Sequence, residues 1–156
     1  MGNALDVVFE LSSWFTDYET APYTNIGEIG PDGIEERLYP ARKWVCTKKV
    51  TSMTGSDPKS RMFWSVFKYI QGGNSAEEKI EMTTPVTTLA KANTAAGSVT
   101  YEMCFFIGAA YESNAPTPSN TRVYIKEEPE RRIFTREGCG WMDAEKGERE
   151  ATELKE

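Results

Sequence analysis

The segment that most restricts the fold of this chain is one amphipathic stretch near its middle, residues 62–71. Its apolar residues recur at intervals of three and four, the period of one helix face; they are Phe63, Val66, Phe67 and Ile70. Asp57 can accept hydrogen bonds from the free N–H groups of a first turn, and Pro58 suits the first helical position. Gly72 and Gly73 can adopt the left-handed conformation that ends a helix. The pattern predicts a helix over residues 62–71 whose apolar stripe packs on another element.

Short apolar runs separated by turn residues surround this helix, and such runs are typical of β-strands. We expect extended segments at residues 34–39, 43–50, 79–89, 99–107, 122–126 and 133–136. The sequence GPDG at 30–33 predicts a turn between extended pieces. Pro85 lacks an N–H group, which places its segment at a sheet edge or a bulge. The last two segments are expected to form a hairpin, and residues 90–98 a flexible loop. Strands outnumber helices, so the predicted class is α+β.

The two ends of the chain differ from this central part. Residues 1–16 carry scattered apolar positions with enough periodicity for a short helix, and we interpret them as an N-terminal arm. Residues 17–156 are then expected to form one domain, which is an ordinary size for a chain of 156 residues. The final stretch, 143–156, contains helix-forming residues but is too polar to pack firmly.

Composition argues against several partners. A net charge of −6 and an isoelectric point near 4.9 repel phosphate backbones, and no basic stripe is evident along the sequence, so no nucleic acid is expected as a partner. The start lacks the features of a signal peptide and no long apolar run occurs, so no membrane insertion is expected. Cys46, Cys104 and Cys139 are odd in number and far apart. They predict no disulfide framework and favour a reducing, cytoplasmic location.

Chemistry is restricted most by the complete absence of histidine. Its absence removes the commonest general base and the commonest metal ligand. Neither a dinucleotide-binding nor a phosphate-binding glycine motif occurs. Adjacent glutamate pairs, such as Glu35 with Glu36, are interpreted as solvated charges because acidic side chains are seldom buried. The sequence therefore predicts a protein that is not an enzyme and has no metal site built from its own side chains.

The outer face of the predicted helix carries a more informative group. Trp64 lies there among cationic and polar side chains, which are Ser60, Arg61, Lys68 and Gln71. A flat anionic ligand such as a porphyrin needs an aromatic wall for its rings and one or two cations for its carboxylates. The same pattern also has a purely structural interpretation, in which Trp64 covers a neighbouring sheet and Lys68 faces solvent. The residues alone leave both interpretations open.

Residues 63–88, FWSVFKYIQGGNSAEEKIEMTTPVTT, resemble the signature of the SOUL haem-binding family: a helix that ends in YIQGxN, a spacer, and then MTxPV. The sequences IEERLYPARKWV at 34–45 and RVYIKEEPERRIFTR at 122–136 resemble the opening hairpin and a later hairpin of that family. Together the similar segments cover residues 17–141 in collinear order. The resemblance implies an α+β fold in which two ferredoxin-like halves form a distorted antiparallel β-barrel flanked by helices.

The resemblance also implies a ligand and a site. It implies haem or another tetrapyrrole, bound non-covalently in an apolar cleft beside the central helix. At the matching positions Phe63, Phe67 and Lys68 face that cleft, and Arg61 lies one residue from a family arginine. We expect Trp64 to belong to the same cofactor-binding set. The SOUL subgroup has a histidine, proposed as an axial ligand, where this chain has Leu38, so histidine ligation is impossible here. Burial and carboxylate pairing would then hold the haem, with a cysteine, tyrosine or methionine as a weak ligand.

Two functions follow from the resemblance. The first is a non-enzymatic carrier or buffer of haem or porphyrin, which the retained MTTPV region favours. The second is a protein-interaction or signalling module of the same fold that has lost functional haem binding, which Leu38 favours. The family usually continues for two more strands beyond residue 156, so the second half is expected to be truncated. That truncation also favours the second function, and no particular protein partner is implied.

Overall fold

The structure is a computed structural model, and it describes residues 7–11, 17–31 and 33–136. The described strands are β1 (Val7–Leu11), β2 (Glu19–Thr20), β3 (Thr24–Ile29), β4 (Ile34–Tyr39), β5 (Arg42–Ser52), β6 (Thr83–Thr84), β7 (Val86–Asn93), β8 (Ser98–Phe106), β9 (Val123–Glu128) and β10 (Arg131–Arg136). The helices described with them are α1 (Lys59–Ile70) and the short 3-10 helix η1 (Ala109–Tyr111). This composition agrees with the predicted α+β class.

The chain divides into two compact units. The first consists of Met1–Ala21 and Lys43–Glu127, and the second of Pro22–Arg42 and Glu128–Glu156. The first unit holds both helices, a five-stranded sheet in the order β1-β7-β8-β5-β9, and the short parallel pair of β2 with β6. The second unit holds a three-stranded sheet in the order β10-β4-β3. The expectation of a β-barrel, which the resemblance implied, needs correction. The described strands form three separate sheets, and none of these closes on itself.

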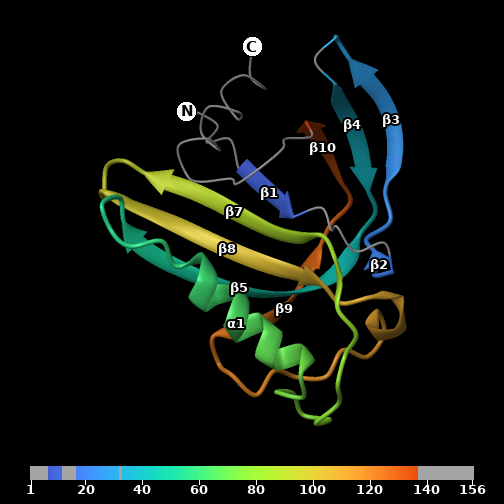
Figure 1. Ribbon diagram of the computed structural model, residues 1–156, viewed down its shortest axis with the longest axis vertical. Coiled ribbons are helices and arrows are strands. Elements are labelled where there is room, and N and C mark those ends of the chain that lie inside the picture. The colour runs from blue at the N-terminus through green and yellow to red at the C-terminus, as the bar shows by residue number, and fades with distance from the viewer. Residues whose placement is uncertain (1–6, 12–16, 32, 137–156) are drawn as a thin grey trace. The chain divides into compact units, whose positions relative to one another are not determined.

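Helix α1 lies across one face of the five-stranded sheet, where the core of the first unit is found (Figure 1). Strand β8 alternates, so that Met103 and Phe105 point into this core from below the helix. From α1, the buried side chains are Met62, Val66, Tyr69 and Ile70. The predicted helix is therefore confirmed, although it begins three residues early. It does so because the Asp57 carboxylate accepts a hydrogen bond from the Lys59 N–H at 2.9 Å, which caps the earlier turn.

The end of α1 is fixed by backbone geometry. Gly72 adopts φ +109°, a conformation that other residues rarely adopt. The Gly73 N–H donates to the carbonyl of Lys68 at 2.9 Å. A Cβ atom on Gly73 would lie 2.7 Å from that carbonyl oxygen, so the approach leaves no room for a side chain. The two glycines thus stop the helix as the sequence predicts.

Asn74 holds the loop that follows the helix. It is only 2% exposed. Its amide nitrogen donates to the carbonyls of Tyr69 at 3.0 Å and Glu78 at 2.8 Å. Its amide oxygen accepts from the N–H groups of Ala76 and Glu78. The Asn74 side chain therefore supplies hydrogen-bond partners to backbone groups that would otherwise have none in this turn.

The MTTPV segment connects this loop to the sheet. The Thr83 hydroxyl donates to the carbonyl of Phe106, which attaches β6 to the end of β8. The Thr84–Pro85 peptide bond is cis, and Pro85 separates β6 from β7. Val86 then enters the core under α1. Pro85 therefore interrupts the extended segment, but the expectation of a sheet edge is wrong for β7, which lies between β1 and β8.

Strand positions were predicted better than strand partners. The expected hairpin of 122–126 with 133–136 is wrong, because β9 belongs to the five-stranded sheet whereas β10 pairs with β4. The opening hairpin is wrong for a similar reason: β5 pairs with β8 over nine positions, and β4 pairs with β3 and β10. A proline lies in each short link, Pro40 and Pro129, and the residue before a proline favours extended backbone. The chain therefore continues into another sheet instead of reversing.

Two further expectations need correction. Residues 7–11 are not helical but form β1, which pairs with β7 from Val7↔Ala90 to Leu11↔Val86. The expected loop at 90–98 is also much shorter, because β7 continues to Asn93 and β8 begins at Ser98. The turn between them uses Gly97 at φ +61°. The predicted turn at 30–33 does join β3 to β4, while the C-terminal residues 143–156 lie outside the described part of the chain.

Cys46 and Cys104 form a disulfide, which corrects the expectation that the cysteines form no disulfide framework. They face each other in the register of β5 and β8, with an S–S distance of 2.04 Å. Both are buried, at 0% and 6% exposed. Their neighbours Val45 and Phe105 point into the core under α1, so the disulfide lies on the opposite face of the sheet. The two cysteines are 58 positions apart in the sequence, so no local spacing indicated that they would pair.

Candidate functional site

Three aromatic side chains lie together along one flank of α1. The rings of Phe63 and Phe67 are stacked with centroids 5.7 Å apart, and Trp64 meets them edge-on at 5.6 and 5.4 Å. Phe63 also contacts Phe105 of β8 at 5.2 Å. We call Phe63, Trp64 and Phe67 the aromatic flank. The structure therefore brings together the three aromatic residues that the sequence analysis assigned to a site.

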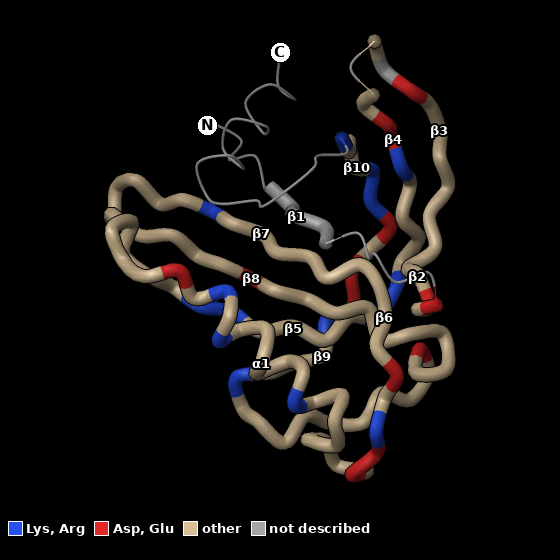
Figure 2. Tube along the Cα trace, viewed as in Figure 1, with Lys and Arg blue, Asp and Glu red and all other residues tan. Residues whose placement is uncertain are grey.

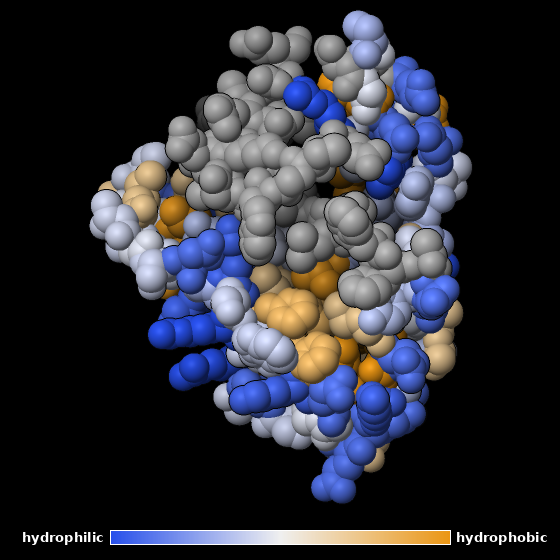
Figure 3. All heavy atoms as spheres, viewed as in Figure 1, coloured by the Kyte–Doolittle hydropathy of each residue, from blue (hydrophilic) through white to orange (hydrophobic). Residues whose placement is uncertain are grey.

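Exposure changes stepwise around this helix. Val66 is fully buried, Phe63 and Phe67 are half-buried, and Trp64 is 55% exposed. The half-buried side chains Met82 and Tyr101 also pack against the core beneath α1. Figure 3 shows apolar side chains gathered at the surface beside α1. The flank thus offers aromatic surface on a rigid helix, as a site for a flat apolar ligand requires.

The two predicted cations lie on the outward face of the helix. Arg61 precedes Trp64 by three residues and Lys68 follows it by four, so all three share one face. Arg61 and Lys68 are exposed, and neither forms an ion pair with another described residue. Their Cα atoms are separated by about 10 Å along the helix axis, at 1.5 Å per residue. The cations flank Trp64 rather than the pair of phenylalanines.

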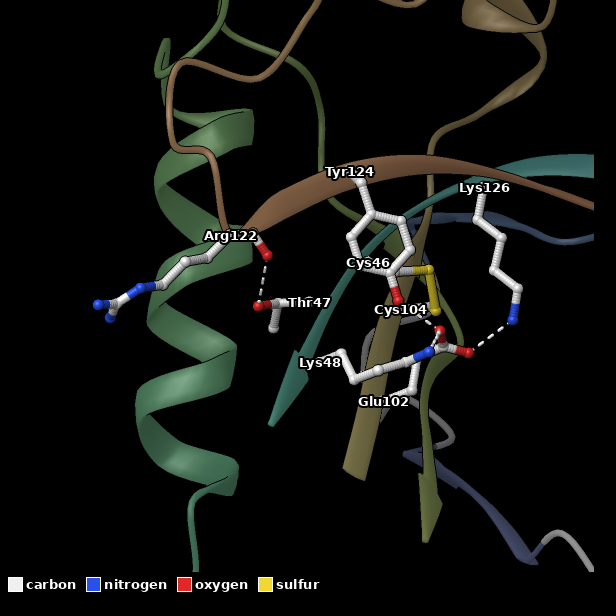
Figure 4. Close-up of polar contacts among 8 residues, drawn as sticks. All are labelled: Cys46, Thr47, Lys48, Glu102, Cys104, Arg122, Tyr124 and Lys126. Carbon is white, nitrogen blue, oxygen red and sulfur yellow. Dashed lines mark hydrogen bonds and ion pairs between the residues drawn. A yellow bond between two sulfur atoms is a disulfide. The ribbon is translucent and has the colours of Figure 1, made fainter. Parts of the chain in front are cut away.

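A second polar cluster, on the opposite face of the same sheet, was missed by the sequence analysis. Glu102 is 7% exposed, and its carboxylate accepts hydrogen bonds from Lys126 at 2.5 Å and from the Tyr124 hydroxyl (Figure 4). Lys48 lies 3.6 Å from the same carboxylate. Burial alone would raise the pKa of Glu102, but these three partners outweigh it and lower that pKa. Only the register of β5 with β8 and the side-chain alternation of β9 could have revealed this cluster.

The Glu102 cluster has the features of a structural element. Every buried side-chain nitrogen and oxygen atom among the described residues has a hydrogen-bond partner. Glu102 itself is engaged by Lys126 and Tyr124 at both of its oxygens. Its charge is therefore balanced within the sheet, and we assign this cluster a structural role.

Two tyrosines near the end of α1 are also engaged. The Tyr69 hydroxyl donates to the carbonyl of Pro116 at 2.8 Å, and burial raises the pKa of Tyr69 to about 12. The Tyr111 hydroxyl donates to Glu78 at 2.7 Å, and this hydrogen bond raises the pKa of Tyr111. Both phenols therefore stay protonated at neutral pH, and neither is suited to act as a base or as a phenolate ligand.

The donor set around the aromatic flank suits a ring better than a metal ion. No group of three or more His, Cys, Asp or Glu side chains is arranged to hold a metal in the described residues. Cys46 and Cys104 are bonded to each other on the far face of the sheet, so neither sulfur can reach α1. Leu38 lies half-buried on β4, opposite Arg132 and Thr24. The flank supplies aromatic surface, and Arg61 and Lys68 beside Trp64 form no ion pair with other described residues.

The fold and this flank define an α+β protein with a partly exposed aromatic surface on its helix. The profile of the family described as SOUL heme-binding protein matches residues 18–156, and the chain belongs to this family. A human protein named Heme-binding protein 2 is 31% identical over 125 residues, which cover 80% of this chain and 60% of the human protein. The mouse protein of the same name is 28% identical over 150 residues, covering 96% of this chain and 69% of the mouse protein.

Among the described residues, no helix combines the length and the apolar character that crossing a membrane requires.

Proposed function

We propose that this chain binds haem or a related tetrapyrrole non-covalently against the aromatic flank, as a carrier or buffer. The observation that carries the proposal is the position of Trp64, a 55% exposed aromatic residue between two stacked phenylalanines and two cations that form no ion pair with other described residues. Membership of the SOUL family and the names of the human and mouse relatives support the same ligand class. The matched part of the human relative is only 60% of its length.

The chemistry of a porphyrin fits this arrangement. Its ring is flat and apolar, and stacking against aromatic side chains removes both surfaces from water. Its two carboxylates extend from one edge, where Arg61 before Trp64 and Lys68 after it offer one cation each. The separation of about 10 Å between the two Cα atoms is within the combined reach of these long side chains.

In this proposal the protein contacts the porphyrin ring and does not rely on coordination of the iron. The chain contains no histidine, and Cys46 and Cys104 are bonded to each other. Titrations with haemin and with iron-free protoporphyrin, followed by the Soret band and tryptophan fluorescence, test this directly. We expect both compounds to saturate with similar affinity. Haemin binding without protoporphyrin binding would contradict the ring-based mode, and saturation by neither would favour the interaction-module function.

The role of Lys68 has its own test. Lys68→Glu should weaken haemin binding at least about tenfold, because a charge-assisted hydrogen bond is replaced by repulsion. Lys79→Glu is the matched control, since Lys79 is also an exposed lysine without an ion pair among the described residues. It lies outside α1, between Glu78 and Ile80, and should leave haemin affinity unchanged. Equal affinities of the two variants would remove Lys68 from the site.

A further inference from the structure

Positive charge is concentrated on one part of this acidic protein. Residues 42–71 contain seven Lys or Arg residues and one Asp, whereas the whole chain carries a net charge of −6. Figure 2 shows Lys and Arg positions of β5 and α1 close together along one side of the first unit. The expectation that no basic stripe exists is therefore wrong. The excess of cations is visible in residues 42–71 of the sequence, where β5 and α1 follow each other along the chain.

Lys49, Arg61 and Lys68 lie on the same side of the sheet. Lys49 pairs in register with Tyr101, whose side chain packs against the core beneath α1, so Lys49 points to the α1 side of β5. Arg61 and Lys68 extend outward from α1 on the face that includes Trp64. We call Lys49, Arg61, Trp64 and Lys68 the basic face.

Arg122 extends this basic face at the start of β9. Its carbonyl accepts a hydrogen bond at 2.9 Å from the hydroxyl of Thr47, a residue whose register partner Met103 belongs to the core beneath α1. Figure 4 shows the Arg122 side chain extending away from the Glu102 cluster. Arg122 is also exposed.

The charges of the basic face are not neutralised within the described residues. Lys48 is tied to Glu102 and Lys59 to Asp57, at 3.6 and 3.1 Å. Lys49 and Arg122, like Arg61 and Lys68, form no ion pair with any described residue. Cations that have no internal partner give an outward positive field, which attracts an anionic surface.

We propose that the basic face docks on an anionic lipid surface. Trp64 decides the class of partner, because an exposed tryptophan among lysines and arginines suits the boundary between lipid headgroups and acyl chains. Each Lys or Arg near an anionic leaflet strengthens binding about fivefold. The net charge of −6 disfavours a long nucleic acid, which would meet repulsion beyond this face. Membrane docking is a function separate from tetrapyrrole binding. It does not require the tetrapyrrole, since the cations are present in the ligand-free protein.

Co-sedimentation of the ligand-free protein with phosphatidylserine-containing vesicles tests the proposal. We expect binding at low salt, its loss at high salt, and no binding to pure phosphatidylcholine vesicles. Lys49→Gln should weaken binding about fivefold, and Arg122→Gln should do the same. Lys79→Gln is the matched control: it removes the same charge beside Glu77, Glu78 and Glu81, and should change nothing. Neither Lys49 nor Arg122 belongs to the proposed tetrapyrrole site, so both variants should still bind haemin.

Three results would overturn the proposal. The first is an absence of binding to phosphatidylserine vesicles at low salt. The second is equal loss of binding in the Lys49→Gln and Lys79→Gln variants, which would reflect net charge instead of a surface. The third is binding to an acidic peptide, such as polyglutamate, without binding to vesicles, which would assign the basic face to a protein partner. Haemin titration of the same protein preparations tests the proposed tetrapyrrole binding independently of vesicle binding.

Discussion

Phe63 of α1 and Phe105 of β8 contact each other with their ring centroids 5.2 Å apart. This contact joins the aromatic flank directly to the core, because Phe105 is 1% exposed in the middle of the sheet. The flank is therefore positioned by the same packing that stabilises the first unit. The loss of stability caused by a substitution should therefore increase with the burial of the side chain that is removed.

Phe105→Ala should destabilise the protein by about 3–5 kcal/mol, because a buried aromatic ring is replaced by a cavity. Phe67→Ala should cost less, about 1–3 kcal/mol, since Phe67 is only half-buried. Denaturant unfolding of both variants measures the two free energies. Equal losses, or a larger loss for Phe67→Ala, would contradict the assigned depths.

Asn74→Ala should destabilise the protein by about 2–4 kcal/mol, because two backbone carbonyls and two N–H groups lose their partner in a buried loop. Asn93→Ala is the control, since Asn93 is exposed and caps one N–H group, that of Ala96. The control should cost about 1 kcal/mol or less. Similar melting midpoints for the two variants would show that Asn74 does not organise this loop.

Glu102→Gln should destabilise the protein at neutral pH by about 1–3 kcal/mol, because Lys126 and Lys48 lose their shared carboxylate. The pKa of Glu102 is lower in the folded protein than its usual value of 4.5. Its contribution is therefore complete above pH 4.5 and is lost as the pH falls through the lower folded-state pKa.

Melting midpoints measured from pH 7 down to the acid range check this dependence. The difference between wild type and Glu102→Gln should shrink as the solution becomes more acidic. Glu127→Gln is the control, because Glu127 is 80% exposed and lies 3.8 Å from Lys43. A difference between wild type and Glu102→Gln that stays constant with pH would contradict the account of the cluster.

Local signals in the sequence predicted the elements well. The apolar stripe of α1, the capping carboxylate of Asp57 and the glycines at 72 and 73 act over a few residues, so each could be recognised without the fold. The YIQGGN segment resembled a family signature, and the structure gives a physical reason for its Gly72 and Asn74. They close the loop after the helix by a positive φ angle and by four side-chain hydrogen bonds.

Long-range relationships could not be obtained in the same way. Cys46 meets Cys104, and Lys48 meets Glu102, only because β5 pairs with β8 in one particular register. A shift of one strand by one residue would send its two side chains to the other face, away from their partners. The partners of β9 and β10 were missed because a short link suggested a hairpin. Helical periodicity placed Trp64 near Arg61 and Lys68, whereas the assignment of Phe63 and Phe67 to the same site came from the family resemblance.

The most direct test of the central claim is haemin titration of three proteins: wild type, Trp64→Ser and Phe134→Ser. Trp64 and Phe134 are similarly exposed, at 55% and 50%, but Phe134 lies on β10 of the second unit. We predict saturable binding by wild type, an affinity about tenfold weaker for Trp64→Ser, and no change for Phe134→Ser. Unchanged affinity of Trp64→Ser, or an equal loss in both variants, would contradict a tetrapyrrole site on the aromatic flank.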